Sequence, residues 1–329
     1  MISKKTLFKI LLALGVTVLF LLVLYRLQKI SLHELWQLFT QASPRFLLLG
    51  LAAVLLANII RGFRFHLLLR RRSTFRDLFA SNNVYNLTTA TFPGGLGEIF
   101  SVFIFQRYGA LNTGAAFSII ALSRLFDLLS LSLLLMIALC FCSCTLARLL
   151  LGTSSLLAVL AFFLLIPRIN RFLVARLIAL LPSRPALQRP AKFLQEIQVA
   201  LAYVQDVREW LILFGLSGVM MTLNILSLLM LLFAAGLEAS FGQATVAFGV
   251  YAILQLFPLH GLGGVGTQEA WWTLGLTSVG FPKEIAVPVS FFLHGMFYLY
   301  ILLIALFFGF PWLRREHPSE VKDGVLLPK

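Results

Sequence analysis

Long apolar stretches separated by short polar or basic segments run through the whole chain. The continuous apolar runs predict helices at 6–27, 46–69, 112–142, 146–166, 210–235 and 285–311. Runs of this length suit a hydrocarbon core about 30 Å thick at a rise of about 1.5 Å per residue. They do not alternate between apolar and polar residues, which excludes a transmembrane barrel. We therefore expect an all-α polytopic membrane protein with about six full transmembrane helices.

Basic residues gather beside the predicted helices and indicate how the chain is oriented. The clusters lie at 4–9, 70–76, 167–208 and 314–315. Lys and Arg favour cytoplasmic loops, so we expect all four clusters, and both termini, on the cytoplasmic side. The first apolar run is long for a signal peptide and is expected to stay as an uncleaved helix. Segment 167–208 mixes arginines with apolar residues, which is typical of amphipathic helices lying on the membrane surface.

Two less apolar segments, 77–108 and 241–283, each carry a proline–glycine break near the middle. If the basic clusters are cytoplasmic, segment 77–108 must enter and leave the membrane from the cytoplasmic side. Segment 241–283 must then enter and leave from the opposite side. Broken backbone at membrane depth is tolerated only where protein buries it or where it lines a water-filled cavity. We therefore expect two re-entrant broken-helix hairpins, one from each face, that together enclose a wet cavity.

An internal repeat relates the two broken segments. In each, a phenylalanine stands ten residues before a tyrosine, and a Phe-Pro pair, several glycines and a glutamate follow. The matched positions are Phe75 and Phe241, Tyr85 and Tyr251, and Glu98 and Glu269. The first helix of the first half (46–69) is expected to run inward and the first helix of the second half (210–235) outward, so the repeat is inverted. Inverted repeats with broken helices are typical of many secondary transporters.

The repeat predicts how a single transmembrane domain is organised. The expected parts are an N-terminal helix and connector (1–44), a first repeat half (45–145), a fourth helix with a cytoplasmic amphipathic linker (146–209), a second repeat half (210–312) and a cytoplasmic tail (313–329).

Composition agrees with a membrane protein and narrows its chemistry. Hydrophobic residues make up 60% of the chain and charged residues 12%, whereas soluble domains are nearer 45–50% and about 25%. The net charge of +14 is spread over the short basic segments, which suits anionic lipid at the cytoplasmic face and no nucleic acid. The three cysteines, in "CFCSC", form neither a metal motif nor a disulfide framework. The sequence contains no nucleophile, ATP or metal motif, so we expect neither a bound cofactor nor enzymatic activity.

Two glutamates, Glu98 and Glu269, follow the glycine-rich breaks. A carboxylate near the bilayer centre must be paired, hydrated or protonated. Both are therefore candidates for head-group binding or for a protonation switch, and the alternative is that each caps its own half-helix. The neighbouring glycines allow backbone amides to approach a ligand at the positive end of a half-helix. These candidate binding glycines are Gly94, Gly95, Gly97, Gly263, Gly264 and Gly266.

Arg124 and Asp127 lie three residues apart on one face of a predicted helix. Arg124 is twelve residues past Asn112, about 18 Å along the helix, and is expected to pair with Asp127, Glu98 or a lipid phosphate. The alternative is a structural ion pair that fixes the rotation of the helix.

A second group of candidates surrounds the first hairpin. Arg61, Arg64 and His66 end the second predicted helix and are expected to snorkel to the interface. Arg61, the deepest, is also a candidate for lining a head-group path. Asn86 belongs to an unusually polar hairpin that fits a hydrated lining. The lone His294 is expected to be a core histidine rather than a metal ligand.

Three motifs in order, "FPGGLGE" (92–98), "SRLFDLL" (123–129) and "GLGGVGTQEA" (261–270), resemble the flippase-like transmembrane domain of lysyl-phosphatidylglycerol synthases. The resemblance covers roughly residues 5–312. It implies a multi-pass lipid translocase, which in bifunctional members moves aminoacylated phosphatidylglycerol made by a soluble C-terminal domain. About 17 residues follow Trp312, so we do not expect that synthase domain or lysyl-lipid synthesis here.

The leading hypothesis is therefore a lipid flippase-like transporter of the bacterial inner membrane, acting on an anionic or phosphate-bearing lipid. The alternative is an accessory membrane protein that binds lipid, or scaffolds a lipid-linked glycosyltransferase or another envelope-synthesis enzyme, without transporting. A lipid-modifying enzyme ranks last. The sequence leaves open a lipid-synthesis partner, a homo-oligomer, the identity of the lipid and the energy source.

Overall fold

A computed structural model describes residues 32–69, 74–92, 102–104, 106, 113–141, 206–255 and 262–313, and within these ranges the chain is helical and contains no strand. The long helices are α3 (Pro44–Leu68), α6 (Thr113–Phe141), α10 (Val207–Ala234) and α13 (Lys283–Ile304). A π-helical turn, η3 (Ala305–Gly309), and α14 (Phe310–Leu313) continue α13. The shorter elements are α2 (Leu32–Gln41), α4 (Phe75–Thr91), α11 (Phe241–Leu254), η2 (Leu262–Gly264) and α12 (Thr267–Ser278).

Four helical stretches are long and apolar enough to cross a bilayer. They are Pro44–Leu68, Ile119–Leu139, Val207–Ala234 and Lys283–Trp312. Each matches one of the helices expected from the apolar runs, and the all-α polytopic membrane fold is confirmed. The expected helices at 6–27 and 146–166, and the amphipathic segment at 167–208, lie outside the described residues. Large apolar side chains such as Leu48, Ile137 and Phe307 are exposed, as expected of surfaces that face lipid.

The two repeat halves begin their hairpins in the same way. Thr74 and Ser240 precede α4 and α11 as N-cap residues. The Thr74 side chain accepts the N–H of Asp77, and the Ser240 side chain accepts the N–H of Gln243, each at 3.2 Å. Such caps satisfy amide groups that have no partner within the helix. The phenylalanines matched in the sequence, Phe75 and Phe241, are therefore the first residues of equivalent helices.

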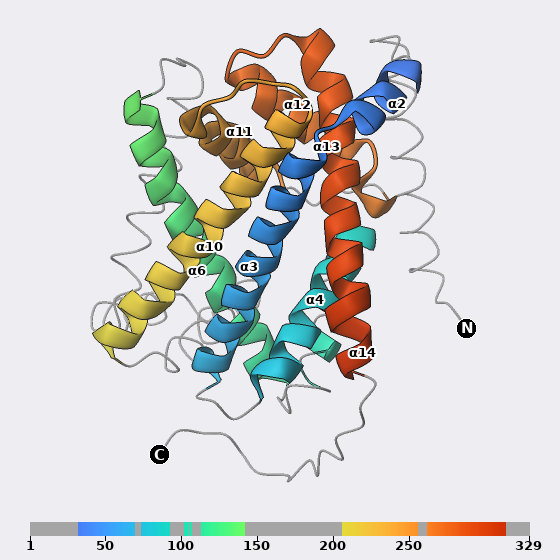
Figure 1. Cartoon of the computed structure of the whole chain (residues 1–329). Helices are drawn as coiled ribbons and strands as arrows, with labels where there is room; N and C mark the ends of the chain where they lie inside the picture. The colour runs from blue at the N-terminus through green and yellow to red at the C-terminus, as the bar shows by residue number, and fades with distance from the viewer. Residues whose placement is uncertain are drawn as a thin grey trace, which may run out of the picture.

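The halves are arranged upside down relative to each other. In the view of Figure 1, α3 and α13 run downward while α6 and α10 run upward. The first helices of the two halves, α3 and α10, pack against each other along their lengths. The hairpin helix α4 occupies the lower half of the molecule, and α11 and α12 occupy the upper half. This is the arrangement that the inverted repeat predicts.

Both hairpins are interrupted inside the membrane-spanning body. In the second, η2 separates α11 from α12, and Gly263, Gly264 and Gly266 adopt φ values of 61°, 74° and 86°. This left-handed backbone is readily available only to glycine. In the first, α4 ends at Thr91 and Phe92 is extended, as expected for the residue before a proline. The remainder of the first break, 93–101, lies outside the described residues.

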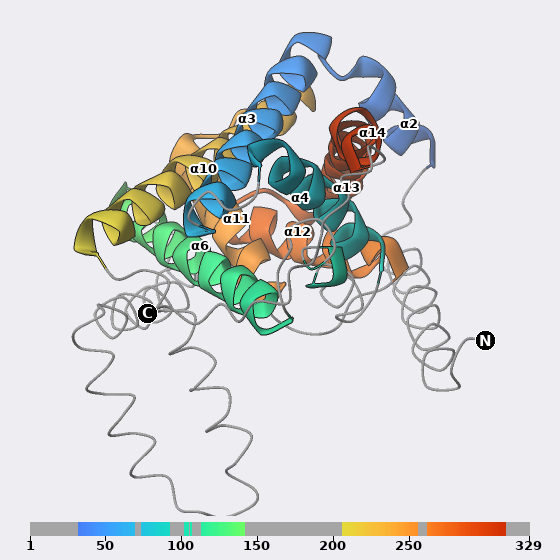
Figure 2. The ribbon, with the colours of Figure 1, turned by 90° about the horizontal axis from the view of Figure 1, so that it is seen from below.

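The end of α4 lies halfway along a spanning helix. The hydroxyl groups of Thr91 and Tyr298 are 3.0 Å apart, and Tyr298 stands fifteen residues after Lys283 and fifteen before Leu313. The α4 helix also contacts η2, the break of the other hairpin. In both views of the ribbon, α4 lies between α3 and α13 (Figures 1 and 2). The end of α4 therefore lies at mid-depth, and α4 contacts the break of the second hairpin.

The second hairpin depends on a close approach between α11 and α12 at Gly275. A Cβ added to Gly275 would lie 2.6 Å from the carbonyl oxygen of Ala247. Because that oxygen belongs to the backbone of α11, it cannot move aside as a side chain would. We expect Gly275→Ala to lower the free energy of unfolding by about 1–3 kcal/mol, the usual cost of overpacking. Denaturant unfolding of the purified protein in micelles measures this change.

Gly218→Ala is the matched control for this substitution. Gly218 lies inside α10, and an added Cβ there has no atom within 4 Å. Alanine favours a helix over glycine, so this variant should be at least as stable as the parent. Equal stability of the two alanine variants would contradict the close packing of α11 on α12.

Candidate functional site

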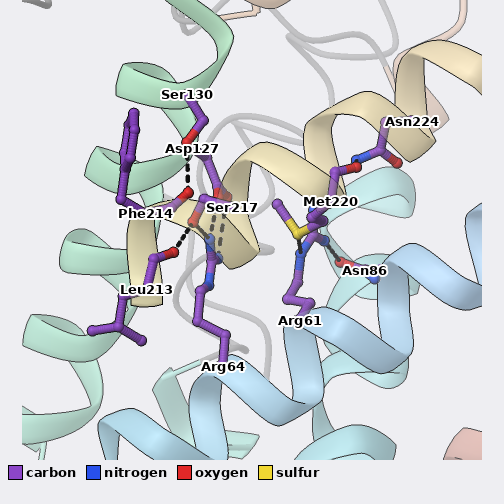
Figure 3. A network of polar contacts seen from close by, with 10 residues as sticks. All are labelled: Arg61, Arg64, Asn86, Asp127, Ser130, Leu213, Phe214, Ser217, Met220 and Asn224. Atoms are coloured by element: carbon purple, nitrogen blue, oxygen red, sulfur yellow. Dashed lines mark hydrogen bonds and ion pairs between the residues drawn. The ribbon is translucent and has the colours of Figure 1, made fainter. Parts of the chain in front are cut away.

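Four helices, α3, α4, α6 and α10, bring buried and partly buried polar groups together (Figure 3). Arg64 extends from α3 and is 1% exposed. Its Nη1 donates to Asp127 Oδ1 on α6 and to Ser217 Oγ on α10, and its Nη2 donates to Asp127 Oδ2 at 3.3 Å. A two-pronged contact of this kind is the strong form of an arginine–carboxylate pair.

This ion pair lies well inside the spanning helices. Asp127 is fourteen residues beyond Thr113, and Ser217 is ten residues beyond Val207. At about 1.5 Å per residue, these positions lie roughly 21 Å and 15 Å along their helices. The expectation that Arg64 snorkels to the interface is therefore wrong. The physical reason is that Asp127 and Ser217 on other helices accept hydrogen bonds from the two terminal nitrogens of the guanidinium, and Asp127 also balances its charge.

Arg61 lies one turn before Arg64 on α3 and contacts neutral groups. It donates to Asn86 Oδ1 on α4 at 3.0 Å and to Met220 Sδ on α10 at 3.2 Å. Asn86 in turn donates to Asn58 Oδ1 at 2.7 Å. Within the described part of the chain, Arg61 makes no ion pair. The structure thus brings together two predicted site residues, Arg61 and Asn86.

Arg124 has a different partner from the one on its own helix. Its Nη2 donates to the Tyr85 hydroxyl at 2.5 Å, and its side chain is exposed. Asp127, one turn further along α6, instead forms an ion pair with Arg64. Pairing between Arg124 and Asp127 is therefore not observed, because Arg64 on α3 competes for the acid. Glu98, the other protein partner considered for Arg124, lies outside the described residues.

Three guanidinium groups and one carboxylate lie close together here among the described side chains. Arg64, Arg124 and Asp127 all lie near enough to Arg61 to act on it electrostatically. Charges in a low-dielectric interior interact far more strongly than in water. An anion that reached this region would therefore be attracted, and phosphate suits arginine through its multiple acceptor oxygens.

The second hairpin positions a separate titratable pair. Glu269 is the third residue of α12, and its Oε2 accepts the N–H of Gly266 at 2.6 Å. Its Oε1 lies 2.7 Å from Nδ1 of His294 on α13. Glu269 is 2% exposed and His294 8% exposed. The alternative that Glu269 caps its own half-helix is confirmed, and the interpretation of His294 as a buried core histidine is confirmed as well.

Both hairpins meet one face of α13. His294 and Tyr298 are four residues apart, which places them one turn apart on the same face of the helix. His294 contacts Glu269 from the second hairpin, and Tyr298 contacts Thr91 at the end of α4. The ends of two segments far apart in the sequence are thus connected through two neighbouring side chains of a single helix.

Several sequence-based expectations lie outside this geometry. Gly94, Gly95, Gly97 and Glu98 fall outside the described residues, so the first wall of the expected cavity is not described. A groove of about 410 Å³ runs between α6 and α10, lined mainly by apolar groups such as Leu133, Phe214 and Val219, and it includes none of the predicted site residues. In the described ranges, no cluster of His, Cys, Asp or Glu has the geometry of a metal site.

Sequence reasoning missed three contacts: Arg64 with Asp127, Glu269 with His294, and Thr91 with Tyr298. All join distant parts of the chain, which hydropathy patterns do not reveal. One signal was available for two of them. Ionisable side chains within apolar runs require partners, and Arg64, Asp127, Glu269 and His294 are four such groups.

Comparison with known proteins gives a family match. The model of the family described as "Lysylphosphatidylglycerol synthase TM region" matches residues 10–305. Neither a curated protein nor a solved structure matches the chain. The matched residues include the first repeat half, most of the second, the arginine cluster and the Glu269–His294 pair.

Proposed function

The chain belongs to the lysylphosphatidylglycerol synthase transmembrane-region family, and from this premise we propose that it moves an anionic or phosphate-bearing lipid between the leaflets of a bacterial inner membrane. The protein acts as a transporter rather than as an enzyme. Both termini face the cytoplasm, as the basic segments indicate.

One observation carries the proposal: Arg61 is a cation within a spanning helix whose described contacts are neutral. Holding such a charge in the membrane interior is costly unless an acid, water or an anionic ligand compensates it. Asp127 is engaged by Arg64, so the guanidinium of Arg61 is available to a ligand. A lipid phosphate fits because it brings negative charge and several acceptor oxygens while its acyl chains remain in the bilayer.

The proposed head-group path follows from the same contacts. Asn86 holds Arg61 on one side, and Arg124 lies nearby with an exposed side chain. A phosphate replaces the Asn86 and Met220 contacts of Arg61 as it enters. The end of α4 and the start of α12 lie beside the middle of α13, at the depth where secondary transporters with inverted repeats commonly bind substrate. Rocking of one half against the other then exposes the head group to alternate sides.

Purified protein in liposomes tests this proposal. A phosphatidylglycerol with a fluorescent label on an acyl chain is placed in both leaflets, and a membrane-impermeant reductant bleaches the outer label. We expect loss of nearly all the fluorescence with the protein and about half without it. A labelled glucosylceramide, which lacks phosphate, is the matched substrate control and should remain near half.

The outcomes separate the proposal from its rival. Equal bleaching of phosphatidylglycerol with and without protein would contradict transport. If the protein nevertheless retained labelled phosphatidylglycerol through purification, the accessory lipid-binding alternative would replace the proposal.

A further inference from the structure

We propose that Glu269 and His294 form a proton-binding site, and that the protein carries one proton together with each anionic lipid in the same direction. The inference rests on the proposed function and adds the energy source to it. It draws on the second hairpin, whereas the proposed head-group site draws on the arginine cluster of the first.

The pair has the geometry of a membrane-embedded proton site. His294 is eleven residues past the start of α13, about 16 Å along the helix. Its Nδ1 and the Glu269 Oε1 are 2.7 Å apart, and both side chains are buried. The other carboxylate oxygen accepts the Gly266 N–H at the beginning of α12. Intramembrane acids and histidines arranged in this way are typical of proton relays.

The 2.7 Å contact allows Nδ1–H to donate to a carboxylate oxygen of Glu269, and the proposal assigns this arrangement. The second ring nitrogen, Nε2, then gains or loses the proton. Without that proton the pair carries a charge of −1, and with it the pair is a neutral carboxylate–imidazolium couple. The Nδ1–H to Oε1 hydrogen bond persists in both states, so the proton can come and go without unfolding α12.

The groups around the pair are compatible with this role. From α11, Tyr251 lies near enough to Glu269 to feel its carboxylate electrostatically, and its hydroxyl donates to Gln268 Oε1 at 3.2 Å. From α13, Tyr298 stands one turn beyond His294. A tyrosine hydroxyl can donate or accept a hydrogen bond, so both side chains offer polar contacts. Among the described residues in contact at this site, the ionisable pair is Glu269 and His294.

The proton site and the arginine cluster are connected by two hydrogen bonds and by positions along α13 and α4. Tyr298, one turn from His294, meets Thr91, the last residue of α4. Five residues earlier on that helix, Asn86 holds Arg61. On the other side, the left-handed glycines of the second break directly precede the α12 turn that Glu269 caps. A change in the charge of the pair therefore acts on both hairpin ends.

Charge balance explains the direction of coupling. The lipid phosphate brings a negative charge into the interior, and a proton on His294 removes one from the Glu269–His294 pair. Movement of both together avoids carrying net charge through a medium where charge is costly. We therefore infer symport of lipid anion and proton.

The test uses the liposome assay with a pH difference of one unit across the membrane and potassium clamped by valinomycin. One coupled proton corresponds to about 1.4 kcal/mol per pH unit, which can sustain up to a tenfold leaflet asymmetry of the lipid. We expect labelled phosphatidylglycerol to accumulate in the leaflet facing the less acidic side. Reversing the gradient should reverse the asymmetry, and a protonophore should abolish it.

Variants assign the effect to the pair. His294→Gln and Glu269→Gln should lose the asymmetry while still equilibrating the lipid between leaflets. His33→Gln, the same substitution at an exposed histidine of α2, should behave as the parent. Lipid that equilibrates evenly under either gradient, or an asymmetry retained in His294→Gln, overturns the inference and leaves the proposed transport standing.

A second readout does not require transport. The protein is labelled with ¹⁵N-histidine, placed in nanodiscs and measured by NMR. The signal that disappears in the His294→Gln variant belongs to His294, and its position reports the charge state of the ring. We expect added phosphatidylglycerol, but not glucosylceramide, to shift that signal toward the protonated form. If transport fails altogether, this shift still supports a proton site linked to anionic lipid. A His294 signal that shifts with neither pH nor added lipid overturns the proposed proton site.

Discussion

Replacing Asp127 by alanine is expected to lower the free energy of unfolding by about 3–5 kcal/mol, the largest stability effect among the substitutions considered. Arg64 is 1% exposed and has Asp127 as its ionic partner. Removing the acid leaves a buried guanidinium without compensating charge, and the remaining contact with Ser217 is neutral. Denaturant unfolding in detergent micelles measures the change.

Two controls make the Asp127 result specific. Glu238→Ala removes an exposed carboxylate between α10 and α11 and should change stability by no more than about 0.5 kcal/mol. The double variant Arg64→Met with Asp127→Leu removes both buried charges and should recover much of the loss, because apolar pairs often replace buried ion pairs. An Asp127→Ala protein as stable as Glu238→Ala would show that Arg64 is not buried against this acid.

Replacing Arg61 by alanine is expected to have the largest effect on lipid movement. A hydrogen bond to a charged group contributes about 1.5–3 kcal/mol, which corresponds to a loss of about 10- to 150-fold in phosphate binding at limiting lipid. Arg61→Lys keeps the charge but loses the planar fork, so it should retain an intermediate rate. The initial rate of phosphatidylglycerol equilibration in liposomes gives both values.

Arg45→Ala is the matched control for Arg61. Arg45 lies at the other end of α3 and is exposed, so its loss changes net charge by the same amount without touching the cluster. The Arg45 variant should transport as the parent does. Equal rates for the Arg45 and Arg61 alanine variants, with both proteins folded, would remove Arg61 from the proposed lipid path.

Local features were predictable from the sequence, and distant partners were not. Spanning helices follow from continuous apolar runs, and α4 and α11 begin at the repeated phenylalanines because the capping residues beside them act within one turn. The cap that Glu269 provides is likewise local, since only three residues separate it from Gly266. These parts of the fold depend on short-range chemistry that is visible in the sequence.

The arginine cluster shows where such reasoning ends. Spacing along α6 favours a pair between Arg124 and Asp127, and the position of Arg64 near the end of α3 favours snorkelling. Packing of α3 between α4, α6 and α10 reverses both outcomes, because it brings Arg64 to Asp127 and Arg124 to Tyr85. The partner of an intramembrane charge is decided by which helices are neighbours, and hydropathy does not specify that.

The most direct measurement is a cryo-electron microscopy structure of the protein in nanodiscs containing phosphatidylglycerol. The account predicts phosphate density about 3 Å from the Arg61 guanidinium, beside Asn86 and the end of α4, with acyl chains extending into the bilayer. Lipid density confined to the outer surface, with Arg61 still bonded to Asn86 and Met220, would contradict it.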